Sequence, residues 1–165
     1  MTPRPMHRQD RQLPQEEAWA LLTQGTYGVL SVVGDEGWPY AVPMHYTVMD
    51  GQIYLHCAKT GYKLDAIARD DRVCFTVTLR EELVQDHATS LYESVVVLGR
   101  AALVTDQATH QAALAHLVDA LGRVSPDLRD QYIARRGQNT AVLVIRPVHL
   151  TGKAKRDFRP IPAAE

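Results

Sequence analysis

The dipeptide Asp50-Gly51 constrains the fold more than any other short feature of the sequence. It separates two segments that resemble β-strands, WPYAVPMHYTV (38–48) and QIYLHC (52–57). An Asp-Gly pair between two such segments is a strong signal for a tight hairpin turn. We therefore expect these segments to form a β-hairpin.

Similar segments, rich in Val, Tyr and Thr, recur along the chain and predict further strands at 27–33, 73–79, 91–104 and 140–150. Short helices are expected between Pro14 and Gly25, over 61–69 with Thr60 as the N-cap, after Asp106, and from Ser125 to Gly137. A polar link is expected over 80–90. Because strands and helices do not alternate regularly, a doubly wound parallel sheet is not expected. The pattern favours a mainly β fold, a closed antiparallel barrel of six strands with short peripheral helices.

The composition is that of one globular domain. The chain has 165 residues, 45% of them hydrophobic, and a formal net charge of -1. We expect a polar N-terminal arm (1–12), one domain (13–158) and a C-terminal tail (159–165). The near-neutral charge argues against binding to nucleic acid or to a membrane surface. With two cysteines, no signal-peptide pattern and no membrane-length apolar run, the chain is expected to be cytoplasmic.

The segment HCAKTGYK (56–63) is the first candidate site. Lys59 and Lys63 flank Gly61 just before a predicted helix. A helix N-terminus and two ammonium groups together favour an anion, and glycine allows close approach of the backbone. The alternative is a solvated basic turn that caps the helix, and the segment alone favours neither reading. It does not match a Walker loop.

Metal and thiol chemistry are weaker readings of the same segment. A zinc site would need His56 and Cys57 together, with His45 or Cys74, but neighbouring residues of a strand point to opposite faces. Nearby cations could lower the pKa of Cys57, yet the sequence offers no base or orienting partner for a cysteine nucleophile. We expect no metal, and we expect both cysteines to be small, partly buried residues.

Two prolines interrupt the strand WPYAVPMHY. Proline cannot donate to a sheet ladder, so Pro39 and Pro43 indicate an edge strand, a bulged strand or one side of an opening in the barrel. Such a place leaves backbone groups free to bind the imide edge of a flat heterocycle. Composition alone prefers a simple protected edge strand. In ESVVVLGRA, Gly99 suggests a bulge, and the apolar run suits a central strand or a subunit interface.

The order of these segments resembles a known family. AVPMHYTV, DG, QIYLHCAKTGYKLDAI and DDRVCFTV, followed by YESVVVLGRAALV and HLTGKAKR, resemble the pyridoxamine 5'-phosphate oxidase-like split barrels. More narrowly, they resemble the Nim-type nitroimidazole-resistance branch. The resemblance covers roughly residues 10–158. It implies a homodimer of six-stranded split β-barrels, with FMN bound in two equivalent clefts at the dimer interface.

The resemblance also implies roles for individual residues. The flavin ring would lie along the backbone of Tyr40, Val42, Pro43 and Met44. The phosphate would be wrapped by the segment that contains His56, Cys57, Ala58, Lys59, Gly61, Tyr62 and Lys63, with Lys63 on the phosphate. Ser94, Val95 and Lys153 would approach the flavin, partly from the other subunit. His56 matches the histidine to which the Nim-type branch gives a functional role, and it is the candidate catalytic residue.

The expected function is that of an FMN-dependent flavin reductase or oxidoreductase. It would pass electrons from NADH or NADPH to a small acceptor such as a nitroaromatic compound. The arginine-rich C-terminal signature of the vitamin-pathway oxidases is missing from the tail RDFRPIPAAE, so oxidation of pyridoxamine phosphate is not expected. The alternatives are a non-catalytic flavin-binding or stress-response module and a split barrel that binds haem or a deazaflavin.

Overall fold

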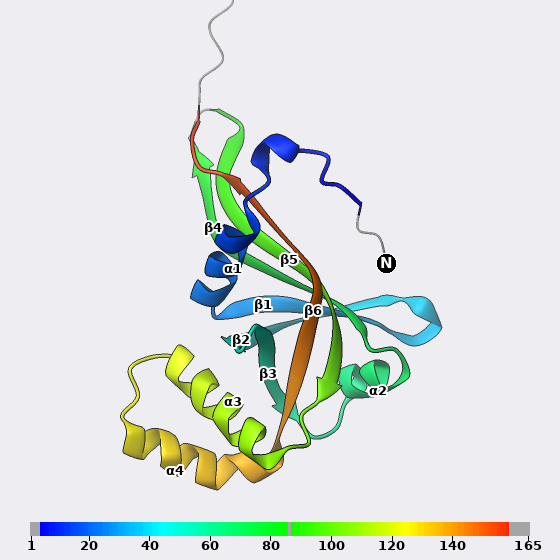
Figure 1. Ribbon diagram of the computed structural model, residues 1–165, viewed down its shortest axis with the longest axis vertical. Helices are drawn as coiled ribbons and strands as arrows, with labels where there is room; N and C mark the ends of the chain where they lie inside the picture. The colour runs from blue at the N-terminus through cyan, green and yellow to red at the C-terminus, as the bar shows by residue number, and fades with distance from the viewer. Residues whose placement is uncertain (1–3, 86, 159–165) are drawn as a thin grey trace, which may run out of the picture.

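A computed structural model describes residues 4–85 and 87–158 of the chain. Within these residues, six antiparallel strands close into a barrel in the order β1-β2-β3-β6-β5-β4 (Figure 1). The strands are β1 (Tyr27–Val33), β2 (Pro39–Met49), β3 (Gln52–Ala58), β4 (Arg72–Val84), β5 (Thr89–Leu103) and β6 (Thr140–Lys155). The predicted fold class, a six-stranded antiparallel barrel with peripheral helices, is confirmed.

In the described part of the chain, four α-helices lie around the barrel. They are α1 (Gln15–Gln24), α2 (Tyr62–Arg69), α3 (Gln107–Ala120) and α4 (Pro126–Arg136), with short 3-10 turns at Gln9–Arg11, Asp35–Gly37 and Gly137–Asn139. Figure 1 shows α3 and α4 side by side at one end of the molecule, and α1 near the middle of the barrel. The α3–α4 pair is inserted between β5 and β6, and α3 lies against β2 and β3 while α4 packs on α3.

The predicted hairpin joins β2 and β3. Met49 pairs with Gln52, and Asp50 and Gly51 both have positive φ, 51° and 70°. Two successive residues with positive φ match the right-handed twist of the strands they connect. This turn fixes the register of β3, and therefore the positions of His56 and Cys57 at its end.

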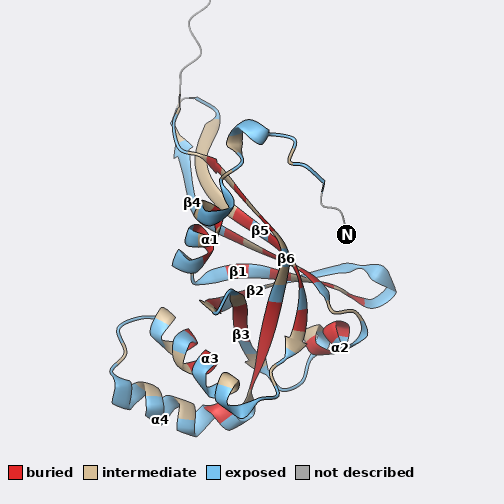
Figure 2. Ribbon diagram, viewed as in Figure 1, coloured by how far each residue is buried: buried red, intermediate tan, exposed pale blue. Residues whose placement is uncertain are grey.

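The interior of the barrel is filled by side chains from every strand. Figure 2 marks the buried residues along these strands in red. Tyr46 and Phe75 meet edge to face, with ring centroids 5.0 Å apart. The buried Tyr46 hydroxyl donates a 2.6 Å hydrogen bond to the carbonyl oxygen of Leu22 in α1. A Cβ at Gly28 would lie 2.5 Å from the Phe75 ring, so only glycine fits there. These contacts join α1, β1, β2 and β4 into one core.

A second, smaller core lies outside the barrel wall, between α3 and the strands β3 and β6. Its buried members are Tyr54, Ala113, Leu114, Leu117, Val142 and Val144. Residues 141–145 of β6 are therefore buried on both faces, which explains the continuous apolar run AVLVI in the sequence. This core attaches α3 to the end of the barrel where β3 stops.

Several local predictions are confirmed. The Asp106 carboxylate accepts a 2.8 Å hydrogen bond from the Thr109 backbone N–H at the start of α3. The Ser125 hydroxyl accepts one from the Leu128 N–H at the start of α4. The register of β5 and β6 shifts between Leu98 and Gly99, which is the irregularity predicted at Gly99.

Two predictions are wrong. Thr60 does not cap α2, because Gly61 is the N-cap residue, with φ 135° and ψ 162°. Residues with side chains rarely adopt that conformation, so the chain reversal falls on the glycine. The expected polar link over 80–90 is instead the outer part of a hairpin, in which Arg80 pairs with Glu93 and Val84 with Thr89. Most of the β4 side chains in this outer part are exposed, so its sequence lacks the apolar alternation that marks a strand.

The ends of the predicted domain are also visible in part. Within the predicted arm, residues 9–11 form a 3-10 turn, and Gln12 forms an isolated bridge with Lys153. At the other end, β6 continues to Lys155, five residues beyond the predicted strand. The predicted tail, 159–165, lies outside the described residues.

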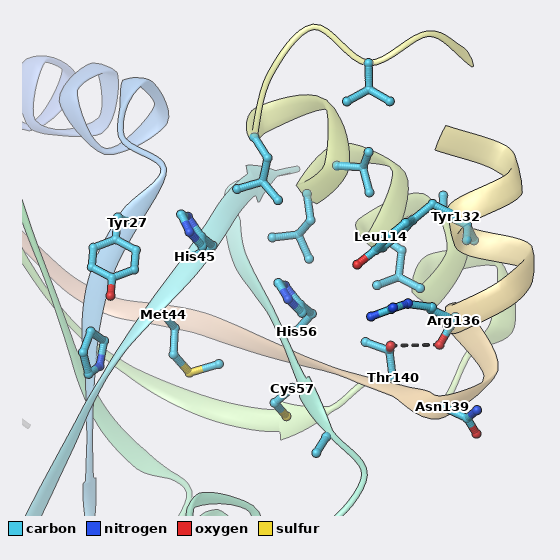
Figure 3. Close-up of a pocket in the computed structure, with 18 of the residues that line it drawn as sticks. Tyr27, Met44, His45, His56, Cys57, Leu114, Tyr132, Arg136, Asn139 and Thr140 are labelled. Atoms are coloured by element: carbon cyan, nitrogen blue, oxygen red, sulfur yellow. Dashed lines mark hydrogen bonds between the residues drawn. The ribbon is translucent and has the colours of Figure 1, made fainter. Parts of the chain in front are cut away.

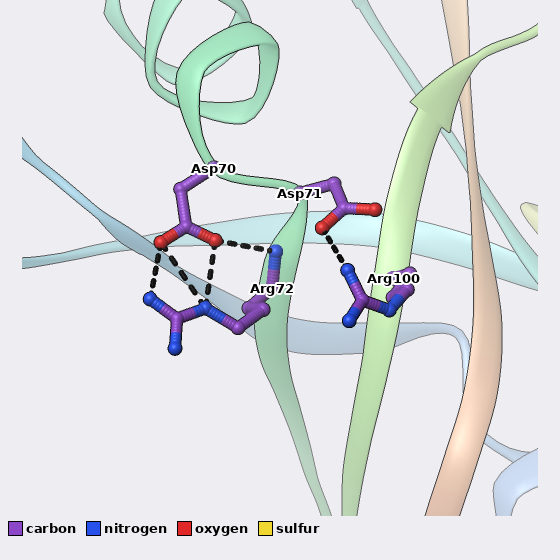
Figure 4. Close-up of polar contacts among 4 residues, drawn as sticks. All are labelled: Asp70, Asp71, Arg72 and Arg100. Carbon is purple, nitrogen blue, oxygen red and sulfur yellow. Dashed lines mark hydrogen bonds and ion pairs between the residues drawn. The ribbon is translucent and has the colours of Figure 1, made fainter.

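Polar contacts hold the carboxyl end of α2 in place. The Arg69 guanidinium forms a 2.6 Å ion pair with Asp35 in the β1–β2 connection. After the helix, Arg72 binds the Asp70 carboxylate through two guanidinium nitrogens, and Arg100 of β5 pairs with Asp71 (Figure 4). The hydrogen bond from Arg72 lowers the pKa of Asp70 to about 2. The carboxyl end of α2 and the start of β4 are thus fixed relative to the barrel.

Candidate functional site

The two prolines of β2, Pro39 and Pro43, lie at an opening in the barrel wall. Residues 39–45 of β2 pair with β1, whereas only residues 46–49 pair with β3. The end of β3, from His56 to Ala58, pairs with β6 alone. Beyond Tyr46 and Leu55, β2 and β3 therefore separate. Of the readings that the prolines allowed, the structure selects an opening in the barrel.

A cavity of about 960 Å³ lies at this opening. It is bounded by β2 and β3 on one side and by α3, α4 and the start of β6 on the other (Figure 3). Its volume lies near the upper end of the range, about 300–1,000 Å³, that is usual for small-molecule sites. We call the β2 and β3 side the strand wall, and the α3 and α4 side the helical wall.

Seven of the predicted site residues line this cavity. They are Val42, Pro43, Met44, His56, Cys57, Ala58 and Lys63. They come from three elements, β2, β3 and α2, which the order of segments in the sequence had indicated as parts of one site. The structure thus brings together the core of the strand segment and most of the segment before α2.

Four other predicted residues lie close to the cavity without lining it. Lys59 lines an adjoining cavity of about 810 Å³. Gly61 provides the reversal before α2. Tyr40 and Tyr62 meet edge to face with centroids 4.7 Å apart, and the Tyr62 hydroxyl accepts a 2.6 Å hydrogen bond from the Asp35 N–H. The two tyrosines join β2 to α2, which supports the placement of Lys63.

The remaining three predicted residues lie elsewhere on the barrel. Ser94 of β5 pairs with Lys153 of β6, and the Lys153 ammonium lies 5.6 Å from the centroid of the Tyr92 ring. Val95 is fully buried in the barrel core. None of the three lines the cavity of its own chain.

Two histidines face the cavity from the strand wall. Figure 3 shows His45 and His56 on the neighbouring strands β2 and β3. The His45 ring lies 4.9 Å from the Tyr27 ring, and its Nδ1 is 3.1 Å from the Thr26 carbonyl oxygen, to which it donates. Burial lowers the pKa of His56, and nearby His45 lowers it further. His56 is therefore biased toward the neutral imidazole, which can both donate and accept a hydrogen bond.

Cys57 does not have the environment of an activated thiol. Burial raises its pKa, and this outweighs the opposing effect of the Lys63 charge. Cys57 packs against the barrel core. The suggestion that nearby cations lower the pKa of Cys57 is therefore wrong, because desolvation penalises the thiolate more than one lysine favours it. Among the described residues, no three His, Cys, Asp or Glu side chains are grouped closely enough to hold a metal ion.

The helical wall was not predicted as part of the site. It contributes apolar side chains from α3, from the α3 C-cap and from α4, including Leu114, Leu117, Leu121 and Leu128, together with Tyr132 and Arg136. The sequence did show an apolar face on α3, and such a face usually indicates core packing. Only the insertion of the helical pair opposite β3 makes it a cavity wall.

The cavity carries positive charge and no negative charge. Lys63 and Arg136 line it, as do two histidines, and none of its lining residues is Asp or Glu. Apolar and aromatic side chains make up most of the rest. The site is suited to a flat, largely apolar molecule that carries an anionic group.

Comparison with known proteins agrees with this class of site. The family model described as pyridoxamine 5'-phosphate oxidase matches residues 14–154. No curated protein matches the chain. The chain belongs to the pyridoxamine 5'-phosphate oxidase family, since the match covers nearly all of the barrel and its helices.

Solved structures share the fold at low identity. A candidate 5-nitroimidazole antibiotic resistance protein from Bacteroides thetaiotaomicron VPI-5482 is 22% identical, over 87% of this chain and 86% of that one, with a TM-score of 0.70. An FAD-binding protein from Mesorhizobium loti is 23% identical, over 88% and 97%, with a TM-score of 0.65. The flavocytochrome Anf3 from Azotobacter vinelandii is 22% identical, over 93% and 73%, with a TM-score of 0.75. At these identities, the likeness shows a common fold.

Across residues 4–85 and 87–158, no helix combines the length and the apolar character that a bilayer crossing requires.

Proposed function

We propose that the protein binds FMN in the cavity at the barrel opening and acts as a flavin-dependent oxidoreductase. The single observation that carries this proposal is the combination of an unpaired strand edge and a cation in one cavity. Residues 39–45 of β2 lack a partner on the side of β3, and Lys63 lines the same space. Flavin-binding relatives of the same fold support the choice of ligand.

The residues present fit a flavin. The free backbone groups between Pro39 and His45 would bind the polar edge of an isoalloxazine ring, and Val42 and Met44 would offer it apolar surface. Lys63 would bind the phosphate, helped by Lys59 and by the backbone at Gly61. With no carboxylate on the cavity wall, nothing opposes the phosphate charge.

His56 would act as a hydrogen-bonding partner at the flavin or at its substrate. Its lowered pKa favours a neutral ring, so it can hold or release a proton without adding a fixed charge. Its position on β3, opposite the helical wall, leaves it accessible to a second molecule in the cavity. This is the role proposed for it, and it is separate from binding the phosphate.

Bound flavin would supply the electron-transfer chemistry, while the chain binds, orients and shields the reactants. NADH or NADPH is the proposed electron source, and a small acceptor such as a nitroaromatic compound is the proposed destination. The similarity in fold to a candidate nitroimidazole-resistance protein supports the choice of acceptor.

We further propose that the protein is a homodimer. The outer face of the barrel carries Val29 and Val96, which are 38% and 36% exposed, in register with Thr76 and Thr151. A second copy covering this face would bury apolar surface that one chain leaves in water. It would also give Ser94 and Lys153 a route to the partner's flavin.

Replacing Lys63 tests the flavin site. In Lys63→Ala, the affinity for FMN should fall by about 1.5–3 kcal/mol, since a charge-assisted contact to phosphate is lost. Lys155→Ala is the matched control, because Lys155 lies on β6 outside the cavity. Affinity is measured by titration of FMN fluorescence, with circular dichroism to verify the fold. If folded Lys63→Ala bound FMN with unchanged affinity, the basic loop would not bind the phosphate and would be ordinary surface.

The absorption spectrum separates the alternatives. A Soret band in place of flavin bands would favour haem, and uptake of a deazaflavin but not FMN would favour that cofactor. FMN bound at high occupancy, without turnover by NADH or NADPH and any of a panel of acceptors, would favour a non-catalytic module.

A further inference from the structure

The helical wall differs chemically from the strand wall on which the flavin is proposed to lie. Its surface is formed mostly by apolar side chains of α3, α4 and the loop that joins them, among which Leu121 and Leu128 remain 51% and 57% exposed. Exposed leucines gathered on one wall of a cavity are unfavourable unless a ligand covers them. A flavin held along β2 would leave this wall available for a second, apolar molecule.

One permanent cation stands at the end of this apolar wall. The Arg136 side chain extends into the cavity toward His56 (Figure 3). Its guanidinium carbon lies 5.5 Å from the centroid of the Tyr132 ring one turn earlier. Stacking on an aromatic face orients a guanidinium without using its hydrogen-bond donors.

The backbone of Arg136 is also held. Its carbonyl oxygen accepts a 2.9 Å hydrogen bond from the Thr140 hydroxyl at the start of β6. The end of α4 is thereby connected directly to the barrel, close to His56, whose backbone partner on β6 is Val142. The guanidinium is therefore presented from a fixed point of the structure.

Among the residues that the structure describes, Arg136 has no anionic partner. None of the ion pairs among the described residues includes it, although eight other arginines form such pairs. The cavity lining supplies no carboxylate. His56 is biased toward the neutral form and does not compete for an anion. The fork of donors is thus available to a ligand.

We propose that the electron acceptor is a flat, largely apolar molecule that carries a carboxylate. Its ring would lie against Leu117 and Leu121, and its carboxylate would bind Arg136 through two parallel hydrogen bonds. This inference rests on the proposed function and specifies the substrate class of that site. Arg136 would be the residue that determines the preference for an anion.

A matched pair of ligands tests this preference. Para-nitrobenzoate and para-nitrobenzamide have nearly the same shape and differ in charge. Isothermal titration of the purified protein should give a preference of about 10-fold or more for the benzoate, the usual value of a bidentate charge-assisted contact. The same order is expected in KM when the two compounds are reduced.

Substitutions at neighbouring arginines locate the effect. Arg136→Gln should weaken the benzoate by about 10–100-fold and leave the benzamide unchanged. Arg136→Lys should restore part of the preference, since it keeps the charge but loses the fork. Arg135→Gln is the control, because Arg135 is the adjacent residue of α4 and does not line the cavity. It should behave as the wild type does.

Three results would overturn the inference. Equal affinity for the two compounds would remove the anion preference. Equally weaker binding of the benzoate and the benzamide in Arg136→Gln would show that Arg136 supports the structure and does not bind the carboxylate. A loss of FMN affinity in Arg136→Gln, with the benzoate preference retained, would assign Arg136 to the cofactor. The proposed function fails separately, if the protein takes up no flavin at all.

Discussion

The two walls of the cavity belong to parts of the molecule that are stabilised differently. The strand wall is the rim of a barrel whose interior includes residues with no exposed surface, such as Leu30, Phe75 and Val97. On the helical wall, α4 has no buried residue, and α3 buries only Ala113, Leu114 and Leu117. The barrel therefore accounts for most of the stability, whereas the helical pair offers surface to a ligand. The following substitutions test this division, from the largest expected effect to the smallest.

Truncation of one large apolar side chain in each part gives the largest contrast. Phe75→Ala should lower the free energy of unfolding by about 3–5 kcal/mol, because it opens a void beside Tyr46 and Gly28. Leu121→Ala should cost less than about 1 kcal/mol, since half of that side chain is already in water. Urea denaturation measures both. Similar losses would mean that the helical pair is as much a part of the core as the barrel.

The next largest loss of stability is expected when the Tyr46 hydroxyl is removed. It satisfies the carbonyl of Leu22 in the last turn of α1, where no helical N–H is available. Tyr46→Phe should destabilise the protein by about 1–2 kcal/mol, since a buried acceptor loses its donor. Tyr27→Phe, at an exposed position, serves as the control in the same denaturation series. A Tyr46→Phe variant as stable as the control would show that water replaces the lost donor.

The N-cap of α3 probes the helical pair itself. Asp106→Ala should cost about 1 kcal/mol, because the Thr109 N–H loses its acceptor, whereas Asp106→Asn should retain most of the stability. Thermal unfolding by circular dichroism compares the two. If alanine and asparagine gave equal losses, the carboxylate would act through its charge and not through the cap.

The smallest effect concerns His56 and pH. Its folded-state pKa lies below the ordinary value of 6.5, first because of burial and then because of His45. As pH falls below 6.5, the unfolded chain takes up a proton that the folded chain resists, so this residue makes the protein less stable in acid. As the pH is lowered from 6.5, the melting temperature of the wild type should therefore fall further than that of His56→Gln. An equal loss in both proteins would show that the environment of His56 does not oppose its charge.

Much of the barrel could be predicted because its signals are local. The turn at Asp50-Gly51, the prolines at 39 and 43 and the bulge at Gly99 each act through backbone conformation at one or two residues. The outer part of the β4–β5 hairpin could not be predicted, because its exposed residues do not show the alternation of apolar and polar side chains that burial imposes. Thr60 was preferred as a cap for its side chain, yet the conformation at Gly61 decided where α2 begins.

The candidate site could be predicted only on its strand wall. Val42, Met44, His56 and Lys63 lie within 22 residues of sequence, and the hairpin brings them together. Arg136 lies far along the chain, in a helix with an ordinary polar pattern. Its place depends on how the α3–α4 pair docks against β3, which is a tertiary contact that no local signal encodes.

The central claim is that the cavity between these two walls holds a flavin. Its most direct test is the absorption spectrum of the purified protein, before and after addition of FMN and removal of the excess. We expect flavin bands at a ratio of one flavin per chain, perturbed from those of free FMN by the apolar cavity. A protein that is folded, shows no flavin bands and retains no added FMN would contradict the account.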